Sequence, residues 1–309
     1  MPDIVISEFM DQAAVDSLAA DFEVLYDPQL VDRHDDLLAA VASARALVVR
    51  NRTQVRGALL EAAGLLRVVG RLGVGLDNID LDACKKRAVT VCPATGANDA
   101  AVAEYVIATA MMLLRDAYAA GTQVITGAWP RQRCMGREVG GKVLGLIGFG
   151  GIARETARRA HALGMRVMAH DPFIAKTDAA WKGVERSELE NLMANADVVS
   201  LHLPLTDDTR GLLDARKIAG MKKGAVLINT ARGGIVDEDA VVESLRAGHL
   251  SGAALDVFES EPVTAASGAR FEGVNNLVLT PHIAGVTQES NVRVSAVTAE
   301  NVRRVLSAK

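Results

Sequence analysis

A glycine-rich turn near the middle of the chain has the residue types and spacing needed to hold phosphate groups. The motif Gly-Phe-Gly-Gly-Ile-Ala at 148–153 follows an apolar run at 143–147 and precedes an amphipathic pattern at 152–163, so a strand, a turn and a helix are expected in that order. Gly148 permits the tight turn, and Gly150 leaves no side chain between the backbone and a pyrophosphate. Free N–H groups at the helix N-terminus attract the phosphate oxygens. The motif therefore predicts a dinucleotide-binding site.

An acidic residue follows the next apolar run at the distance expected for a ribose contact. Asp171 lies 18 residues beyond Ala153, directly after the strand pattern at 166–169. Ala153 is small enough for the third glycine position of the motif, where helix and strand pack closely. The carboxylate of Asp171 is placed to accept hydrogen bonds from the adenosine ribose hydroxyls and to repel a 2′-phosphate, and no arginine follows it directly. We therefore expect NAD rather than NADP.

Three side chains suited to acid–base chemistry and anion binding also follow apolar runs. They are Arg232 in Ile-Asn-Thr-Ala-Arg-Gly-Gly, Glu261 in Leu-Asp-Val-Phe-Glu-Ser-Glu-Pro, and His282 in Thr-Pro-His-Ile-Ala-Gly. Open α/β sheets bind ligands at the carboxyl ends of their strands. An imidazole titrates near working pH and can transfer a proton, and a guanidinium presents a planar fork of donors to a carboxylate. These residues predict proton transfer on a substrate that carries a carboxylate.

The elements that must position these residues alternate between short apolar runs and longer amphipathic stretches. Strands are expected at 4–6, 46–49, 66–69, 143–147, 166–169, 197–201, 225–228 and 277–279, and helices at 10–20, 53–63, 99–115, 152–163 and 289–306. Runs that are apolar on both faces are typical of parallel strands covered by helices. We expect an α/β fold with two Rossmann-like domains, each a doubly wound parallel sheet.

The two long helical patterns predict a boundary that the chain crosses twice. The pattern at 99–115 precedes the dinucleotide motif, and the pattern at 289–306 follows the last strand. We therefore expect a discontinuous first domain, residues 1–98 and 286–309, which binds the substrate. Residues 99–285 are expected to form the NAD-binding domain.

The composition excludes several other classes of protein. The 309 residues are half hydrophobic and 23% charged, with a net charge of −4, which suits two globular domains and disfavours nucleic acid as a partner. The cysteines, Cys84, Cys92 and Cys134, lack C-x-x-C spacing, which argues against a disulfide framework or a metal site. The apolar run at 100–114 is broken by Glu104 and is too short to span a bilayer. No pattern at the N-terminus is typical of a signal peptide, so a cytoplasmic protein is expected.

Taken together, these motifs resemble those of the D-isomer-specific 2-hydroxyacid dehydrogenases, a family that includes D-3-phosphoglycerate, glyoxylate/hydroxypyruvate and D-lactate dehydrogenases. The resemblance runs from Arg-Asn-Arg-Thr at 50–53 and Gly-Val-Gly-Leu-Asp-Asn-Ile-Asp at 73–80 through to the loop of His282. It implies an NAD-dependent homodimer that transfers a hydride between NAD(H) and C2 of a small 2-hydroxy or 2-keto acid.

The resemblance also implies a role for each site residue. His282 would be the base in oxidation and the acid in reduction, Glu261 would pair with its other ring nitrogen, and Arg232 would bind the carboxylate and the developing oxyanion. Asp256 would hold the nicotinamide carboxamide. The other implied cofactor contacts are Gly151 and Ile152 at the pyrophosphate, Thr230 and Ala231 with Arg232, His282 and Gly285 along the nicotinamide half, and His202, Pro204 and Thr209 near the adenosine.

The same resemblance assigns the substrate contacts to the first domain. Val74 and Gly75 would offer N–H groups to the carboxylate, and Arg50, Asn51 and Arg52 would face the substituent on C3. Two arginines there favour an anionic arm: phosphate, sulfonate or a second carboxylate. The alternative is that one or both arginines cap the strand or face solvent. The segments at 5–11, 70–77, 129–132 and 169–173 are especially similar to the (S)-sulfolactate dehydrogenase branch, so sulfolactate or 3-phosphoglycerate is favoured, with the choice between them open.

Three alternatives remain from the sequence. A hydroxypyruvate or glyoxylate reductase would use the same machinery on a neutral arm. A non-enzymatic NAD(H)-sensing protein is possible because corepressors resemble this family. Formate dehydrogenases of the family have Gln at the position of Glu261, since formate has no hydroxyl proton to remove, and Glu261 therefore counts against that branch.

Overall fold

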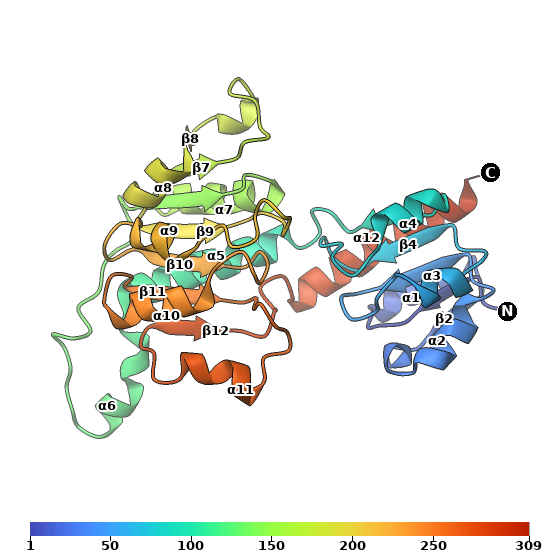
Figure 1. Ribbon diagram of the computed structural model, residues 1–309, viewed down its shortest axis with the longest axis horizontal. Coiled ribbons are helices and arrows are strands. Elements are labelled where there is room, and N and C mark those ends of the chain that lie inside the picture. The colour runs from blue at the N-terminus through green and yellow to red at the C-terminus, as the bar shows by residue number, and fades with distance from the viewer. Residues whose placement is uncertain (309) are drawn as a thin grey trace. The chain divides into compact units, whose positions relative to one another are not determined.

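The computed structural model describes residues 1–308, which divide into two compact units. One unit consists of Met1–Asn98 together with the chain from Val286 onward, and the other of Asp99–Gly285. Both contain a parallel sheet with helices on its two faces (Figure 1). The predicted α/β class, with two Rossmann-like units of which the first is discontinuous, is confirmed.

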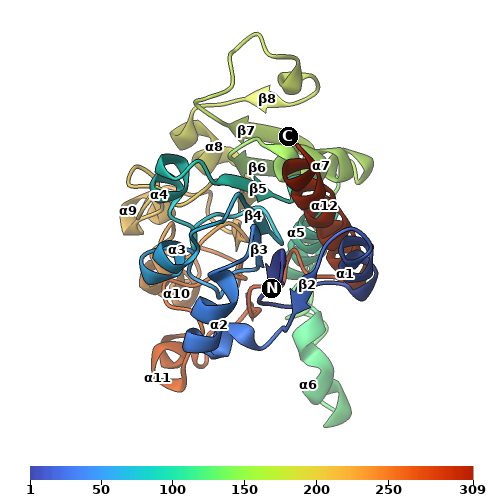
Figure 2. The ribbon, with the colours of Figure 1, turned by 90° about the vertical axis from the view of Figure 1, so that its right-hand side faces the viewer.

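The first unit is a five-stranded sheet of order β2-β1-β3-β4-β5 in which every neighbouring pair is parallel. Its strands are β1 Ile4–Ile6, β2 Val24–Tyr26, β3 Ala46–Val49, β4 Val68–Arg71 and β5 Thr90–Pro93. Its helices are α1 Gln12–Ala19, η1 Leu30–Asp32, α2 His34–Val41, α3 Ala58–Ala62, α4 Leu81–Lys86 and α12 Gln288–Ser307. Figure 2 shows α1 and α12 on one face of this sheet and α2, α3 and α4 on the other.

The second unit is a seven-stranded parallel sheet of order β12-β11-β10-β9-β6-β7-β8. Its strands are β6 Val143–Ile147, β7 Arg166–His170, β8 Glu185–Arg186, β9 Val198–Leu201, β10 Val226–Asn229, β11 Gly252–Leu255 and β12 Leu277–Leu279. Its helices are α5 Asp99–Arg115, η2 Tyr118–Ala120, α6 Gly121–Ile125, α7 Gly151–Ala162, η3 Ala179–Trp181, α8 Leu189–Asn195, α9 Ala215–Ala219, α10 Glu238–Arg246, α11 Ala265–Gly268 and η4 Ala269–Phe271. The strand order reverses at β6, and such a switch point is where open α/β sheets bind ligands.

Burial explains why these segments are strands. All five residues of β6 are buried, and apolar clusters cover the sheet on both faces, as expected for parallel strands under helices. Ala153 has no exposed surface, which allows α7 to pack closely against α5 and the sheet. The burial therefore brings the start of α7 to the carboxyl end of β6.

The helix predicted at 53–63 is mostly wrong, because only Ala58–Ala62 is helical. The N–H of Thr53 donates to a buried carboxylate, and Val55 pairs with Ile79 as an isolated parallel bridge. Gly57 then has a φ of 50°, which a continuous helix does not allow. The apolar spacing was correct for a buried segment, but its backbone groups are used by tertiary hydrogen bonds.

Three strands, β2, β5 and β8, were not expected from the sequence. For β11 the sequence indicated only that an apolar run ends at Leu255. Strand β11 reads Gly-Ala-Ala-Leu and has no β-branched residue, although all four residues are buried, and β8 has only two residues. These strands form because their neighbours supply the hydrogen bonds.

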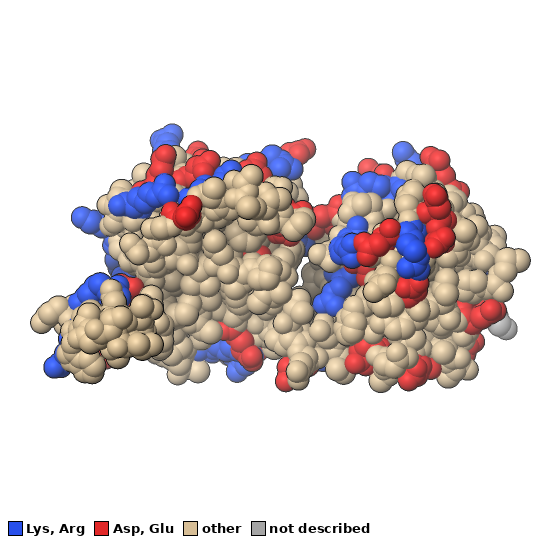
Figure 3. Space-filling model, turned by 90° about the horizontal axis from the view of Figure 1, so that it is seen from below, with Lys and Arg blue, Asp and Glu red and all other residues tan. Residues whose placement is uncertain are grey.

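The charged side chains of both signs are mixed on the surface that Figure 3 shows. On the face drawn in Figure 3, acidic and basic side chains are interspersed on each unit rather than segregated by sign. Within residues 1–308, no helix combines the length and apolar character of a membrane span, and no three His, Cys, Asp or Glu side chains gather as a metal site would require.

Candidate active site

The glycine-rich turn adopts the geometry that its sequence predicts. Gly148 has a φ of 85°, and a Cβ on it would overlap the carbonyl oxygen of His202, so only glycine fits. A Cβ on Gly150 would meet nothing within 4 Å, so the space over the start of α7 is open. The turn therefore leaves room for a ligand against the N-terminus of α7.

Asp171, at the end of β7, is hydrogen-bonded to this turn. Its Oδ2 accepts the N–H of Phe149 at 2.9 Å, and its Oδ1 accepts the N–H of Phe173 at 2.9 Å. The ring of Phe149 is buried and stacks on Trp181 with centroids 5.2 Å apart. The carboxylate thus has a structural role besides the predicted ribose contact, which remains a prediction.

A polar atom without a partner lies in the loop after β10. Thr230 Oγ1 is buried and, among residues 1–308, has no hydrogen-bond partner. A buried hydroxyl without a partner is costly, and a bound group that donates or accepts there would remove the cost. The hydroxyl of Thr230 is suited to a hydrogen bond with the nicotinamide half of NAD, and the open space at Gly150 is suited to the pyrophosphate. The residues of this unit therefore fit NAD.

The loop that carries Arg232 is fixed from within. Asn229 Oδ1 accepts the N–H of Ala231 at 3.0 Å, and Asn229 Nδ2 donates to the carbonyl of Arg232 at 3.0 Å. The half-buried guanidinium of Arg232 donates to the carbonyl of Ala231 at 2.6 Å. A Cβ on Gly233 would overlap the carbonyl oxygen of Phe258, so the loop lies tightly against the segment after β11.

His282 and Glu261 form the predicted pair. Nδ1 of His282 lies 2.7 Å from Oε2 of Glu261, and Oε1 of Glu261 accepts the N–H of Phe258 at 3.0 Å. Burial raises the pKa of Glu261, but the hydrogen bonds from His282 and Phe258 and the charges of His282 and Arg232 outweigh it, so the pKa lies below its usual value. An ionised carboxylate on Nδ1 leaves Nε2 to exchange a proton with a substrate. The charge of Arg232 acts on the same carboxylate, so the three predicted catalytic residues form one electrostatic group.

Asp256 holds the backbone of the His282 loop. It is buried, and its Oδ1 accepts the N–H of Ile283 at 2.8 Å while its Oδ2 accepts the N–H of Ala284 at 2.8 Å. The N–H of His282 donates to the carbonyl of Asp256 at 2.8 Å. His282 has a φ of 55°, uncommon for a residue with a side chain, and these bonds hold it there. Contact of Asp256 with the nicotinamide carboxamide stays a prediction.

The sequence did not indicate the hydrogen-bonded series that runs from Asp256 through Thr280 to Tyr105. Thr280 Oγ1 donates to Asp256 Oδ1 at 2.6 Å and also lies 2.6 Å from the hydroxyl of Tyr105 on α5. Burial raises the pKa of Tyr105. Asp99, at the first turn of α5, was also missed, and a Cβ on Gly151 would overlap its carboxylate. A carboxylate therefore lies beside the predicted pyrophosphate contact, and burial and the charge of Glu155 raise the pKa of Asp99 above its usual value.

The residues predicted near the adenosine lie after β9. Burial lowers the pKa of His202 to about 4, so its ring is neutral at pH 7, with Nε2 3.0 Å from Ser200 Oγ. Thr209 Oγ1 donates to the carbonyl of Pro204 at 2.7 Å and fixes that loop. His202 therefore supports the turn at Gly148 through its backbone, and its contact with the adenosine remains a prediction.

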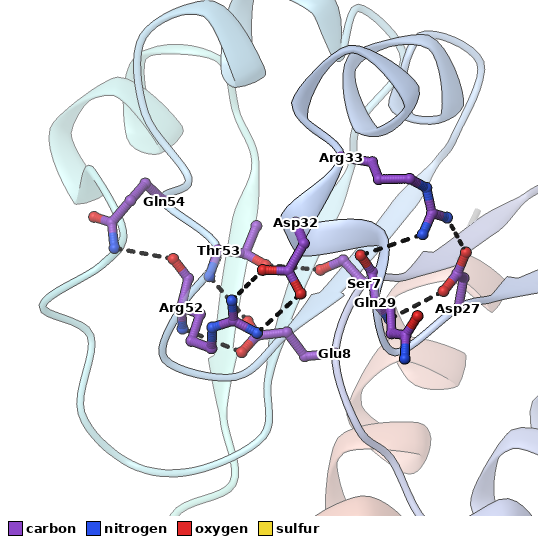
Figure 4. Close-up of polar contacts among 9 residues, drawn as sticks. All are labelled: Ser7, Glu8, Asp27, Gln29, Asp32, Arg33, Arg52, Thr53 and Gln54. Carbon is purple, nitrogen blue, oxygen red and sulfur yellow. Dashed lines mark hydrogen bonds and ion pairs between the residues drawn. The ribbon is translucent and has the colours of Figure 1, made fainter. Parts of the chain in front are cut away.

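The predicted substrate residues of the first unit lie at the ends of β3 and β4. Arg50 donates from Nη2 to Asn291 Oδ1 at 2.8 Å, and its guanidinium lies 5.9 Å from the ring centroid of Phe9. Arg52 instead forms an exposed ion pair with Asp32, as Figure 4 shows. Asn51, Val74 and Gly75 are at least partly accessible. The two arginines thus have different surroundings, a difference that the sequence alone did not reveal.

Comparison with known proteins agrees with this geometry. Residues 107–284 match the family model described as the D-isomer specific 2-hydroxyacid dehydrogenase, NAD binding domain. The chain is 57% identical over 310 residues to (S)-sulfolactate dehydrogenase of Chromohalobacter salexigens, with all of both chains covered. It is 39% identical to D-3-phosphoglycerate dehydrogenase of Mycobacterium leprae, matching all of this chain but 58% of that one. The structure of D-lactate dehydrogenase from Aquifex aeolicus, complexed with NAD and lactic acid, is similar with a TM-score of 0.84 at 26% identity, over 98% of this chain and 95% of that one.

Proposed function

We propose, on the premise that the chain belongs to the D-isomer-specific 2-hydroxyacid dehydrogenase family and is an NAD-dependent oxidoreductase, that its substrate is (S)-sulfolactate. The observation that carries the proposal is the sequence identity of 57% to a sulfolactate dehydrogenase along the full length of both chains. Arg50 supports it, because a half-buried cation whose hydrogen-bond partner is the neutral amide of Asn291 suits a sulfonate. 3-Phosphoglycerate presents the same charges, and the relatives that use it are similar over all of this chain at lower identity.

The residues of the second unit would carry out the proton chemistry. In oxidation, His282 accepts the C2 hydroxyl proton through Nε2 as the hydride leaves C2, and in reduction it returns that proton to the oxygen. Glu261 fixes the tautomer through Nδ1 and stabilises the imidazolium. Arg232 binds the carboxylate and the oxyanion that develops at C2. NAD, when bound, would accept the hydride from C2 of the substrate.

Arg50 and Arg52 provide the test of the anionic arm. Replacing Arg50 by glutamine should raise KM for sulfolactate about tenfold or more, since a charge-assisted hydrogen bond is lost, and should leave KM for D-lactate nearly unchanged. Replacing Arg52 by glutamine should have less effect, because Asp32 already pairs with that side chain. Parallel losses on both substrates in the Arg50 variant would sink the assignment.

We also propose that the protein is a homodimer. The segment around η2 and α6, which projects from the second unit in Figure 1, exposes large apolar side chains that a monomer would leave in water. They are Tyr118 at 72%, Ile125 at 86%, Trp129 at 72% and Met135 at 75% exposed. A second copy that covers them would explain this surface. Sedimentation of an Ile125→Asp variant should shift toward the monomer, and an unchanged dimer would place the interface elsewhere.

A cytoplasmic location accompanies this function. Within residues 1–308 the three cysteines are free thiols, with Cys84 and Cys92 buried, as is usual in a reducing compartment. The proposal predicts that fractionation of the producing cells finds the protein with the cytoplasmic enzymes.

A further inference from the structure

Two buried polar side chains hold the backbone of the loop of residues 50–53, one by accepting its N–H groups and the other by donating to its carbonyls. The first is Glu8, which is 4% exposed and follows β1. Its Oε1 accepts the N–H groups of Arg50 at 2.8 Å and Thr53 at 3.0 Å, and its Oε2 accepts the N–H of Arg52 at 3.1 Å. Figure 4 shows this carboxylate directed at the backbone of the loop. One side chain thus binds three of the four N–H groups of the segment.

The second side chain is Asn78, which is 6% exposed. Its Nδ2 donates to the carbonyl of Thr53 at 2.7 Å and to that of Arg50 at 3.2 Å. Its own backbone carbonyl accepts the N–H of Val55 at 2.8 Å, and the N–H of Asp80 donates to the carbonyl of Val55 at 3.0 Å. Asn78 belongs to the segment 73–80, so these bonds join the two predicted substrate loops into one rigid piece.

Burial of the Glu8 carboxylate has a free-energy cost that an apolar side chain would not have. Burying a carboxylate costs much of its hydration, and only a full set of donors offsets that cost. An apolar contact would stabilise the fold without this desolvation cost, but it would leave the orientation of the backbone N–H groups less well defined. The hydrogen bonds of Glu8 therefore fix the backbone conformation of this loop at some cost in folding free energy.

Glu8 and Asn78, together called the clamp below, also direct the two arginines to different partners. Because their N–H groups are fixed, Arg50 extends toward Asn291 on α12 and Arg52 extends to Asp32 on η1. Hydrogen bonding to Asp32 raises the pKa of Arg52, whereas burial lowers the pKa of Arg50 with the charge of Glu8 opposing. Arg50 is held as the cation for an anion, whereas Arg52 is already paired with Asp32 at the surface.

We propose that Glu8 and Asn78 are positioning residues for substrate binding. They hold the loop 50–53 against the segment 73–80, so that the guanidinium of Arg50 and the N–H groups of Val74 and Gly75 stay at a fixed separation. This fixed separation would favour 2-hydroxy acids in which the carboxylate is C1 and the second anionic group is attached at C3. The inference rests on the proposed function, since it assigns both loops to the substrate.

The experiment compares Glu8→Gln with Asp27→Asn in the full-length protein. Glutamine has the shape of glutamate, but its amide nitrogen faces an N–H donor of the loop where an oxygen accepted one. Asp27 is a matched control because it is a carboxylate of the same unit that pairs with Arg33 and does not contact the loop. KM and kcat are measured for sulfolactate and D-lactate, with the NADH dissociation constant from fluorescence and the melting temperature.

For Glu8→Gln we expect KM for sulfolactate to rise about tenfold, with kcat within threefold and NADH binding unchanged. The preference for sulfolactate over D-lactate should fall, while Asp27→Asn should match the wild type. A lower melting temperature with unchanged KM would overturn the proposal, because the clamp would then only stabilise the fold. Equal losses on both substrates would overturn the selection of the arm.

Asn78→Ala is the second variant, in case Glu8→Gln does not fold. It leaves Glu8 in place and removes only the donors to two carbonyls, and the same rise in KM with little change in kcat is expected. A wild-type enzyme that prefers a neutral-arm acid would overturn the proposed substrate instead. The clamp is then tested with that acid, where a rise in KM in both variants supports positioning of the carboxylate and an unchanged KM refutes it.

Discussion

Replacing Glu261 by glutamine tests whether His282 needs a carboxylate or only a hydrogen-bond partner. Oε2 of Glu261 lies 2.7 Å from Nδ1 of His282, and Oε1 accepts the N–H of Phe258. Glutamine has the same size and can still accept one of these bonds, but it carries no charge. The change therefore removes the electrostatic support of the imidazolium with little change in packing.

The geometry sets the size of the effect. Hydrogen bonds to charged groups contribute about 1.5–3 kcal/mol. The side chains of His282 and Glu261 are 39% and 32% exposed, so solvent screening reduces the expected loss to about 1–2 kcal/mol. If that loss falls on proton transfer, kcat should decrease about 5- to 30-fold. NADH binding should be unchanged.

The pH dependence of stability has a definite sign. The pKa of Glu261 lies below its usual value in the folded protein, because the bonds and charges of its partners outweigh burial. The pair therefore stabilises the fold above the pH at which an unfolded glutamate ionises, and this contribution is lost as the pH falls through the folded pKa. The variant should be less stable than the wild type at pH 7, and the difference should disappear in acid.

The assay follows NADH oxidation with the keto acid between pH 5 and 9, with Glu259→Gln as the control because Glu259 is an exposed neighbour in sequence. The wild type and control should share one pH–rate profile, and in Glu261→Gln the activity should decline at a lower pH. A kcat within twofold of the wild type and an unchanged profile would refute the proposed role of the carboxylate.

Three further predictions concern the cofactor and the loops. Asp171→Ala should reduce the preference for NAD over NADP, measured as a ratio of kcat/KM, and an unchanged ratio would place the ribose contact elsewhere. Asp99→Asn should tighten NADH binding about fivefold at low salt, because a carboxylate against Gly151 repels the pyrophosphate, and the gain should shrink at high salt; weaker binding would contradict this. Gly233→Ala should lower the free energy of unfolding by about 1–3 kcal/mol or more in denaturant titrations, because its Cβ would overlap the carbonyl of Phe258; full stability would show that the loop can move.

The sequence predicted the features that depend on local pattern. The apolar run at 143–147, the glycines after it and the helix at 99–115 are where the pattern indicated, because burial and turn geometry specify them residue by residue. The pairing of Glu261 with His282 was implied by the resemblance to the family. The structure accounts for it, because the adjacent parallel strands β11 and β12 bring their carboxyl ends to one edge.

What the sequence did not indicate depends on contacts between distant residues. The role of Glu8 follows from hydrogen bonds to a loop more than 40 positions away, and no local pattern encodes them. The same holds for Tyr105 and Thr280 behind Asp256. The different surroundings of Arg50 and Arg52 are set by Asn291 and Asp32, which lie on other elements.

The central claim is that the chain is a dehydrogenase for a 2-hydroxy acid with an anionic arm. The most direct measurement is NADH formation from NAD with sulfolactate, D-3-phosphoglycerate, glycerate, malate and D-lactate, compared as kcat/KM. We predict that sulfolactate gives the highest value and that D-lactate and glycerate fall far below it. A neutral-arm acid with the highest value, or NADH binding without turnover of any of the five acids, would contradict it.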